Sequence, residues 1–328
     1  MDRLRHVDDW RPGTSFDTLR ARACLLMRIR TFFAASGVLE VETPLAGISF
    51  GTDPAIEPLR SRFIGPGYAR GLDLYLQSSP EFFMKRLLAA GSGPVWQLCK
   101  AFRNGEAGSR HNPEFTLLEW YRPGVDENAL MDEVTALVCA AMEQDLPAEY
   151  CSYAALFRIH LGIDPLEADT GNLRDCALAH DVPGAEGLVL ERDGWLDLLM
   201  STLIEPLLGR DGLTFVTDYP ASQASLARLA PDGRTASRFE LYWQGMELAN
   251  GFHELKDAAE QAQRFERENC RRYSAGQVPM PVDDALLEAL EHGLPDCAGV
   301  ALGVDRLLMC QLGLDDIDQV LAFSFSRL

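Results

Sequence analysis

The sequence has 328 residues, 47% of them hydrophobic, which suits one large globular domain or two small ones, and it contains no run of about 18 apolar residues that could span a membrane. Its eight cysteines are spread evenly without a Cys-x-x-Cys pair, which argues against a zinc site or a disulfide framework and favours free thiols in a reducing cytoplasm. The formal net charge of −19 disfavours a large nucleic-acid footprint, because contacts to phosphates need clustered lysine and arginine.

Hydrophobic periodicity and turn residues divide the chain into helices and strands. The elements predicted up to residue 145 are a helix at 17–36, strands at 38–43 and 72–77, a helix at 79–90, strands at 95–103 and 114–122, and a helix at 126–145. Residues 146–234 are predicted to form short helices broken by Gly and Pro, an insertion on the same domain. The remaining predicted elements are strands at 238–244 and 246–252, a helix at 257–276, and a strand at 298–304 that enters a helix at Asp305.

The predicted strands come in hairpins rather than in βαβ units. Such an order favours an antiparallel sheet flanked by helices, an α+β domain, and disfavours a Rossmann fold. Glycine-rich phosphate loops of the Walker or dinucleotide type are absent from the sequence.

Polar and aromatic residues cluster around the loop of residues 104–113, which is long for a hairpin and is therefore predicted to be functional. Strand parity places Phe115, Glu119 and Tyr121 on one face, where Phe115 could stack on a flat ring and the other two could hold an amine. Arg103 ends the preceding strand, where its planar fork suits a phosphate or a carboxylate. A solvated loop beside an ordinary core strand would show the same pattern, so periodicity alone leaves both interpretations open.

A second cluster lies on the hairpin of strands 238–244 and 246–252. A two-residue turn would place Glu240 and Glu247 on one face, a carboxylate pair of the kind that binds Mg²⁺ together with substrate phosphates. Asn250 and Glu254 reach the same face only if a β-bulge forms, which we predict at Asn250-Gly251 because glycine permits it. Scattered acids on an exposed strand are the alternative.

The third cluster is the small-residue strand that leads into the last predicted helix. Its glycines allow a ligand to approach the backbone, and Arg306 follows at the start of the helix, where anions are favoured. A tightly packed strand-to-helix turn would look the same. Together the three clusters supply a phosphate-binding arginine pair, a stacking ring and a metal carboxylate pair, which is what forming an acyl-adenylate from a carboxylate and ATP requires.

These segments resemble the motifs of class II aminoacyl-tRNA synthetases in their lysyl form. Residues 102–121 resemble motif 2, residues 303–306 resemble motif 3, and residues 37–44 resemble motif 1, which lies at a dimer interface in that class. Residues 247–255 resemble the lysyl signature before motif 3. The resemblance implies an antiparallel class II catalytic domain over residues 1–328, and it runs from about residue 16 to the end.

The chain is more similar still to the truncated paralogues of lysyl-tRNA synthetase, the elongation factor P–(R)-β-lysine ligases. Residues 79–87 and 220–227 resemble that group, as does Ala301 where the synthetases have Gly. Because the resemblance to the catalytic domain begins within about the first twenty residues of the chain, we expect no anticodon-binding domain and no stable tRNA binding. The resemblance implies a cytoplasmic homodimer that uses ATP and Mg²⁺, with a diamino acid as small substrate and the ε-amine of a lysine on elongation factor P as acceptor.

The resemblance also assigns residue roles. Arg103 and Arg306 would be the catalytic, phosphate-binding arginines, and Glu240 and Glu247 would bind the metal. The residues implied in ATP binding are Arg103, Asn104, Gly105, Glu106, His111, Asn112, Phe115, Glu247, Leu248, Gly303 and Arg306. The residues implied in substrate binding are Ser79, Pro80, Glu81, Glu119, Tyr121, Asn250, Glu254 and Ala301.

One position departs from the family pattern, because Gly105 stands where the family usually has Glu in motif 2. Glu106 follows directly and could replace the missing contact to adenine after a local shift. A minimal lysyl-tRNA synthetase acting on L-lysine and an inactive regulatory paralogue are the alternatives, the second favoured only by Gly105.

Overall fold

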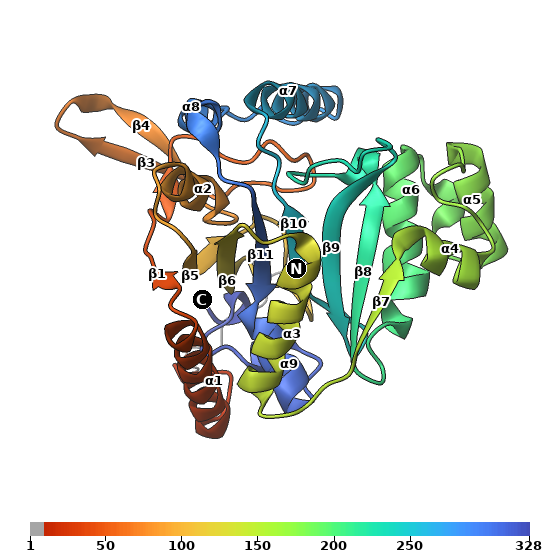
Figure 1. Ribbon diagram of the computed structural model, residues 1–328, viewed down its shortest axis with the longest axis horizontal. Coiled ribbons are helices and arrows are strands. Elements are labelled where there is room, and N and C mark those ends of the chain that lie inside the picture. Colours follow the sequence, from red (N-terminus) through yellow and green to blue (C-terminus); the bar gives the residue numbers. More distant parts are fainter. Residues whose placement is uncertain (1–9) are drawn as a thin grey trace.

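A computed structural model of the protein describes residues 10–328, and its centre is an eight-stranded sheet (Figure 1). The strand order is β1-β5-β6-β11-β10-β9-β8-β7, and all neighbours are antiparallel except the edge pairs β1–β5 and β7–β8. Its strands are β1 Leu39–Glu40, β5 Val95–Phe102, β6 Glu114–Pro123, β7 Ala148–Ser152, β8 Leu213–Pro220, β9 Thr235–Trp243, β10 Met246–His253 and β11 Cys297–Gly303. A smaller sheet consists of β2 Ala46–Gly47, β3 Arg60–Gly65 and β4 Tyr68–Leu76. The predicted antiparallel α+β class is confirmed.

Helices cover both faces of the main sheet. They are α1 Phe16–Ala35, α2 Glu81–Ala89, α3 Glu127–Met142, α4 Tyr153–Leu161, α5 Thr170–Ala179, α6 Arg192–Leu199, α7 Ala258–Ser274, α8 Asp284–Gly293 and α9 Val304–Leu312. Shorter helical turns are Ala185–Gly187, Met200–Ile204, Glu205–Leu207, Ala221–Gln223, Ile317–Gln319 and Phe325–Arg327. Figure 1 shows α1, α3 and α9 on one side of the sheet, α2, α7 and α8 at its other side, and α4–α6 beside β7 and β8. No helix of the described residues combines the length and the apolar character that crossing a bilayer requires.

The main core lies between the sheet and the helices α1, α3 and α9. Ser15 caps α1 by accepting a hydrogen bond from the Thr18 amide, and the helix buries one stripe that ends in Phe33. The Phe33 ring stacks on Trp96 with 4.7 Å between centroids. The other buried residues of this stripe are Leu25 and Ile29.

The β9–β10 hairpin confirms the expected turn and corrects the expected bulge. Gln244 and Gly245 both have positive φ, and Tyr242 pairs with Glu247 as predicted. The register shifts between Glu247 and Ala249, so the bulge does not lie at Asn250-Gly251 as predicted. After this shift Asn250 pairs with Glu240, which brings Glu240, Asn250 and later Glu254 to one face of the sheet.

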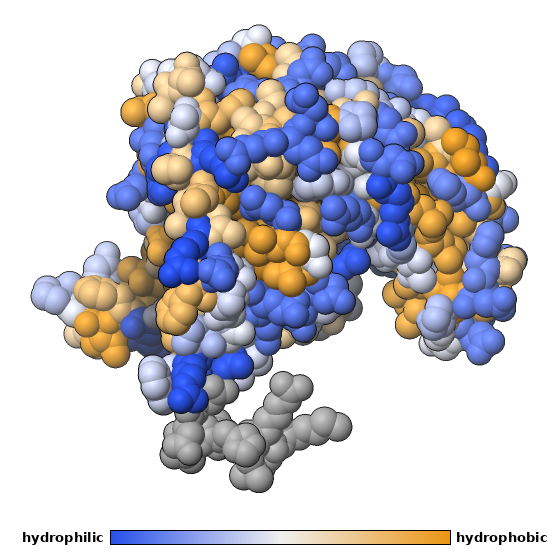
Figure 2. All heavy atoms as spheres, turned by 90° about the horizontal axis from the view of Figure 1, so that it is seen from below, coloured by the Kyte–Doolittle hydropathy of each residue, from blue (hydrophilic) through white to orange (hydrophobic). Residues whose placement is uncertain are grey.

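The other differences concern strand extent. The strand expected over 38–43 pairs only at Leu39–Glu40, and the β3 half of the projecting β3–β4 hairpin was not predicted. Besides short helices, the segment 146–234 contains β7 and β8, which extend the main sheet. Its helices α4–α6 form a lobe with a hydrophobic core of its own. Figure 2 shows this lobe at the right, with a hollow between it and the main body.

Candidate active site

A cavity of about 260 Å³ lies on the face of the sheet that carries α2, α7 and α8. Three of the carboxylates that line it were predicted to bind substrate, and they come from different elements: Glu81 from the first turn of α2, Glu119 from β6, and Glu254 directly after β10. The register explains their meeting, because Ala301 on β11 pairs with Glu119 on one side and with Asn250 on the other. Of the predicted substrate residues, the cavity is lined by Ser79, Glu81, Glu119, Tyr121, Asn250, Glu254 and Ala301.

Glu119 is buried and held by two hydroxyl groups. Ser79 Oγ donates a hydrogen bond to it at 2.7 Å, and Tyr121 donates another at 2.6 Å. Burial raises the pKa of Glu119 to about 8, and the neighbouring Glu81 carboxylate adds to the rise. A positively charged group beside Glu119 would therefore be strongly stabilised. Pro80, also predicted for this site, precedes α2 and does not line the cavity.

Lys85 is a buried cation that the sequence did not single out. Its Nζ lies 2.6 Å from Glu81 Oε1 and 2.6 Å from Glu254 Oε2. Burial alone would lower the pKa of Lys85, but the two carboxylates reverse this effect and hold it above its usual value. Burial raises the pKa of Glu254 to about 7 despite the attraction of Lys85. The i,i+4 spacing from Glu81 was the available signal.

Gly299 on β11 has no side chain, so neighbouring side chains can approach the strand backbone closely at this cavity. A Cβ atom there would lie 2.2 Å from a Tyr121 ring carbon and 2.6 Å from Glu254 Oε1. Because Gly299 has no side chain, Tyr121 and Glu254, both candidates for binding an amine, can pack directly against its backbone.

Arg103, Phe115 and Glu106 lie together at the start of the 104–113 loop. The Arg103 guanidinium lies 5.1 Å from the Phe115 ring centroid, and its Nη1 lies 3.7 Å from Glu106 Oε2. Arg103 Nε is buried and has no hydrogen-bond partner in the part of the chain that the structure describes. Such a donor fits a bound anion, the role expected for Arg103. Gly105 has φ +84°, a conformation that a glutamate at this position would adopt only with strain.

A second arginine group brings Arg306, Glu247 and His111 together. Arg306 Nη1 donates to the Glu247 carbonyl at 2.9 Å and lies 3.1 Å from its carboxylate, and Nη2 contacts His111 Nε2 at 2.7 Å. Burial, followed by the charge of Arg306, lowers the pKa of His111, so the ring is neutral near pH 7. Gly303 caps α9 just before Arg306, and Leu248 is buried at the bulge.

Two asparagines predicted for ATP have structural roles. Asn112 Oδ1 accepts from the Phe325 amide at 2.9 Å and its Nδ2 donates to the Glu114 carbonyl, so both polar ends of the side chain are engaged. The backbone N–H of Asn104 donates a hydrogen bond to the Glu57 carbonyl. These bonds anchor the loop, and the direct contacts of both residues to ATP stay predictions.

The predicted metal carboxylates line a neighbouring cavity of about 480 Å³. Glu240 accepts hydrogen bonds from Tyr219 and Tyr242, each at 2.5 Å, and from Arg238. Glu247 lies on the same strand face, and the described residues contain no group of three or more metal-ligating side chains. The pair fits a magnesium ion that takes its other ligands from phosphates and water.

Arg238 separates the two cavities and was not foreseen. It lines both, ion-pairs with Glu240 at 2.5 Å, and donates to Asn250 Oδ1 at 3.3 Å. Its guanidinium lies 4.4 Å from the Tyr219 ring centroid. Arg238 thus connects a metal candidate with a substrate candidate.

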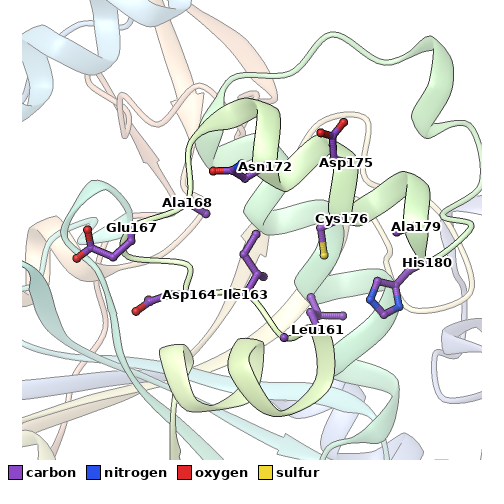
Figure 3. A pocket seen from close by; sticks show the side chains of 11 residues that line it. Leu161, Ile163, Asp164, Glu167, Ala168, Asn172, Asp175, Cys176, Ala179 and His180 are labelled. Atoms are coloured by element: carbon purple, nitrogen blue, oxygen red, sulfur yellow. The ribbon is translucent and has the colours of Figure 1, made fainter.

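A larger cavity of about 570 Å³ lies in the lobe between the end of α4 and α5 (Figure 3). Asp164 there pairs with Arg158, and Asn172 belongs to the cap of α5. Burial raises the pKa of the Cys176 thiol, which makes it a poorer nucleophile. The polar groups of this cavity therefore support local structure.

Comparison with known proteins agrees with this geometry. A family model described as tRNA synthetases class II (D, K and N) matches residues 3–161 and 201–327. Proteins named elongation factor P–(R)-β-lysine ligase from Salmonella arizonae, Salmonella paratyphi B and Salmonella heidelberg are each 51% identical to the chain over 319 residues, which covers 97% of this chain and 98% of the relative. The unmatched residues 162–200 lie in the lobe of α4–α6.

Proposed function

The chain belongs to the family of class II tRNA synthetases (D, K and N), and from this premise we propose that it activates (R)-β-lysine with ATP and transfers it to a lysine ε-amine of elongation factor P. The observation that carries the proposal is the cavity in which the half-buried Glu81 meets the buried Glu119 and Glu254, beside an arginine whose buried Nε has no hydrogen-bond partner among the described residues. A diamino acid supplies two ammonium groups for the carboxylates, and its own carboxylate is left to react.

The two half-reactions need positioning more than acid–base catalysis. In the first, a carboxylate oxygen of β-lysine attacks the α-phosphorus of ATP, and pyrophosphate leaves. In the second, the acceptor amine attacks the acyl carbon, and AMP leaves. Arg103 and Arg306 would neutralise the phosphate charge, and Phe115 would stack on adenine. Glu119 with Tyr121, and Glu254 with Glu81, would hold the ammonium groups.

Glu240 and Glu247 would hold Mg²⁺, which neutralises phosphate charge when bound. Tyr219, Tyr242 and Arg238 fix the Glu240 carboxylate in place. Burial raises the pKa of the adjacent Glu205 to about 7, with Glu240 and Glu247 adding to the rise. A cation in this cavity would relieve that repulsion, which supports the assignment.

The chain would work as a homodimer of single catalytic domains in the cytoplasm, without stable tRNA binding. Support for the dimer comes from apolar side chains exposed along the segment that resembles motif 1 and beside it. They include Leu39, Leu45 and Ile48. Sedimentation of the purified protein would give the mass of one chain if this part of the proposal is wrong.

Pyrophosphate exchange into ATP tests the activation step, with purified protein, Mg²⁺ and no tRNA. The amino acids compared are (R)-β-lysine, L-lysine and none. Exchange that strongly favours β-lysine supports the ligase, and acylation of purified elongation factor P then tests transfer. Preference for L-lysine would point to a tRNA-directed enzyme. No exchange with either diamino acid would contradict activation and draw attention to Gly105.

A further inference from the structure

Among residues 10–328, Lys85 is the one cation that forms ion pairs with Glu81 and Glu254, two of the carboxylates of the 260 Å³ cavity. It is almost fully buried, and both of its ion pairs, to Glu81 and to Glu254, are 2.6 Å long. Glu254 accepts no hydrogen bond of good geometry, so the Lys85 ammonium is its close partner. The ion pairs join α2 to the end of β10 behind the cavity.

The charges around Lys85 do not cancel. Glu81, Glu119 and Glu254 raise one another's energy when ionised, and Lys85 offsets only one of the three. Burial, followed by the charge of Glu81, raises the pKa values of both Glu119 and Glu254. The other charged side chains of the cavity wall have further partners: Arg103 with Glu106, Arg238 with Glu240, Asp53 with the Ala55 amide, Glu268 with Thr52, and Asp283 with Ser49.

We propose that Lys85 is a built-in counter-ion that cancels one of the three carboxylates and thereby matches the cavity to substrates with two ammonium groups. The proposal rests on the function put forward above and adds a specificity-determining residue to it. Two substrate ammonium groups neutralise the other two carboxylates of this trio, whereas a substrate with one ammonium group leaves one of the three without a partner, which is costly in apolar surroundings.

The same charge count makes an unusual prediction for paired substitutions. In Glu254→Gln, Lys85 loses one of its two carboxylates, and its ammonium repels the second ammonium of the substrate. Removing that ammonium as well, in Lys85→Met with Glu254→Gln, restores two uncompensated carboxylates. The second substitution should therefore repair part of the damage of the first. Independent structural losses would instead add up.

Isothermal titration calorimetry without ATP measures this directly. The ligands are (R)-β-lysine and (R)-3-aminohexanoic acid, which is β-lysine without its terminal amine. We expect the double variant to bind β-lysine at least about tenfold more tightly than Glu254→Gln, a coupling within the usual range for contacting residues. The preference for the diamino ligand should fall in Glu254→Gln and recover in the double variant. Lys100→Met, at a half-exposed lysine outside the cavity, is the matched control.

A double variant that binds β-lysine no better than Glu254→Gln would overturn the proposal. If the Glu254 variants fail to fold, as judged by circular dichroism, the pair Glu81→Gln and Lys85→Met with Glu81→Gln makes the same test, since Glu81 is the other partner of Lys85. Pyrophosphate exchange by the wild type is scored separately. Tight binding without exchange would contradict the proposed function alone, and absence of β-lysine binding to the wild type would overturn both.

Discussion

Glu119 shows how strongly a single side chain depends on its surroundings. Its carboxyl is buried among other acids, and its pKa is raised to about 8. A carboxyl whose folded pKa exceeds its unfolded value favours folding at low pH, and this contribution is lost as the pH rises from about 4.5 to about 8. The ligand-free protein should therefore lose stability over this range through Glu119.

Glu119→Gln should remove that contribution. Relative to wild type, the variant should gain unfolding free energy as the pH rises from about 5 to about 8, with a limiting slope of about 1.4 kcal/mol per pH unit. Urea denaturation across the pH series measures the difference. Glu288→Gln, at an exposed helix position, is the control and should follow the wild type. Parallel curves for Glu119→Gln and wild type would show that Glu119 is ionised in the folded state.

Arg306 is proposed to act in catalysis rather than in folding. Its partners are Glu247, His111 and the Arg110 carbonyl at the mouth of the site. Arg306→Ala should lower pyrophosphate exchange by about 10²–10³-fold, because a preorganised positive charge near the phosphates is lost. Binding of β-lysine without ATP should change little. Arg20→Ala, at an exposed arginine on α1, is the control, and a loss below tenfold for Arg306→Ala would contradict its role.

Sequence patterns indicated Glu119 and Glu254, and the family resemblance added Glu81, but neither indicated the basic residues Lys85 and Arg238 behind them. Glu119 and Tyr121 share a strand face, so parity alone brought them together. Lys85 and Arg238 depend on partners from other elements, since Lys85 contacts Glu254 after β10 and Arg238 contacts Asn250 across the hairpin. An alternating pattern contains no information about such neighbours, and a buried charge is indistinguishable in sequence from a solvated one.

At the scale of elements, the bulge in β10 illustrates both success and failure. The need for a bulge followed from parity, because Asn250 and Glu254 had to reach the face of Glu240. The position of the bulge could not be predicted from the presence of a glycine, because Gly251 serves close packing rather than the bulge. A Cβ atom at Gly251 would lie 2.3 Å from the Phe239 ring and 3.0 Å from the Gly299 carbonyl, so glycine is required there for close packing.

The strand β8 was missed for a related reason. Most of its residues are buried on both faces, so the run from Leu213 lacks the alternation that marks a half-exposed strand. It lies in the interior of the main sheet, between β7 and β9, within a segment whose glycines and prolines suggested short helices. The hairpins β5–β6 and β9–β10 were predicted because their turns and faces are encoded locally.

Gly299 on β11 allows a test of how closely β6, β10 and β11 enclose the site. Gly299→Ala should displace the Tyr121 ring and Glu254, cost about 1–3 kcal/mol of stability, and weaken β-lysine binding more than ATP binding. Denaturation and calorimetry measure the two effects. Gly187→Ala is the control, because nothing lies within 4 Å of its Cβ position. Unchanged β-lysine affinity in Gly299→Ala would show that the Tyr121 ring and Glu254 can move away from β11 without weakening substrate binding.

For the whole molecule, the net charge of −19 opposes binding to nucleic acid. At physiological salt, the Kd for tRNA should be larger than about 10 µM, because no excess of basic side chains is available to release counter-ions. Filter binding with an intact lysyl-tRNA synthetase as positive control measures this. Saturable binding at lower concentration would revive the tRNA-directed alternative.

The cage around Lys85 also bears on how such an enzyme survives its own intermediate. An acyl-adenylate acylates any amine that carries a free electron pair, and the nearest protein is the enzyme itself. Glu81 and Glu254 keep the Lys85 nitrogen protonated, so it lacks that electron pair although it lies directly behind the cavity proposed to bind the amino acid. Intact-mass and peptide analysis after incubation with ATP and β-lysine should find Lys85 unmodified, because the ion pairs that tune the cavity also protect it from self-acylation.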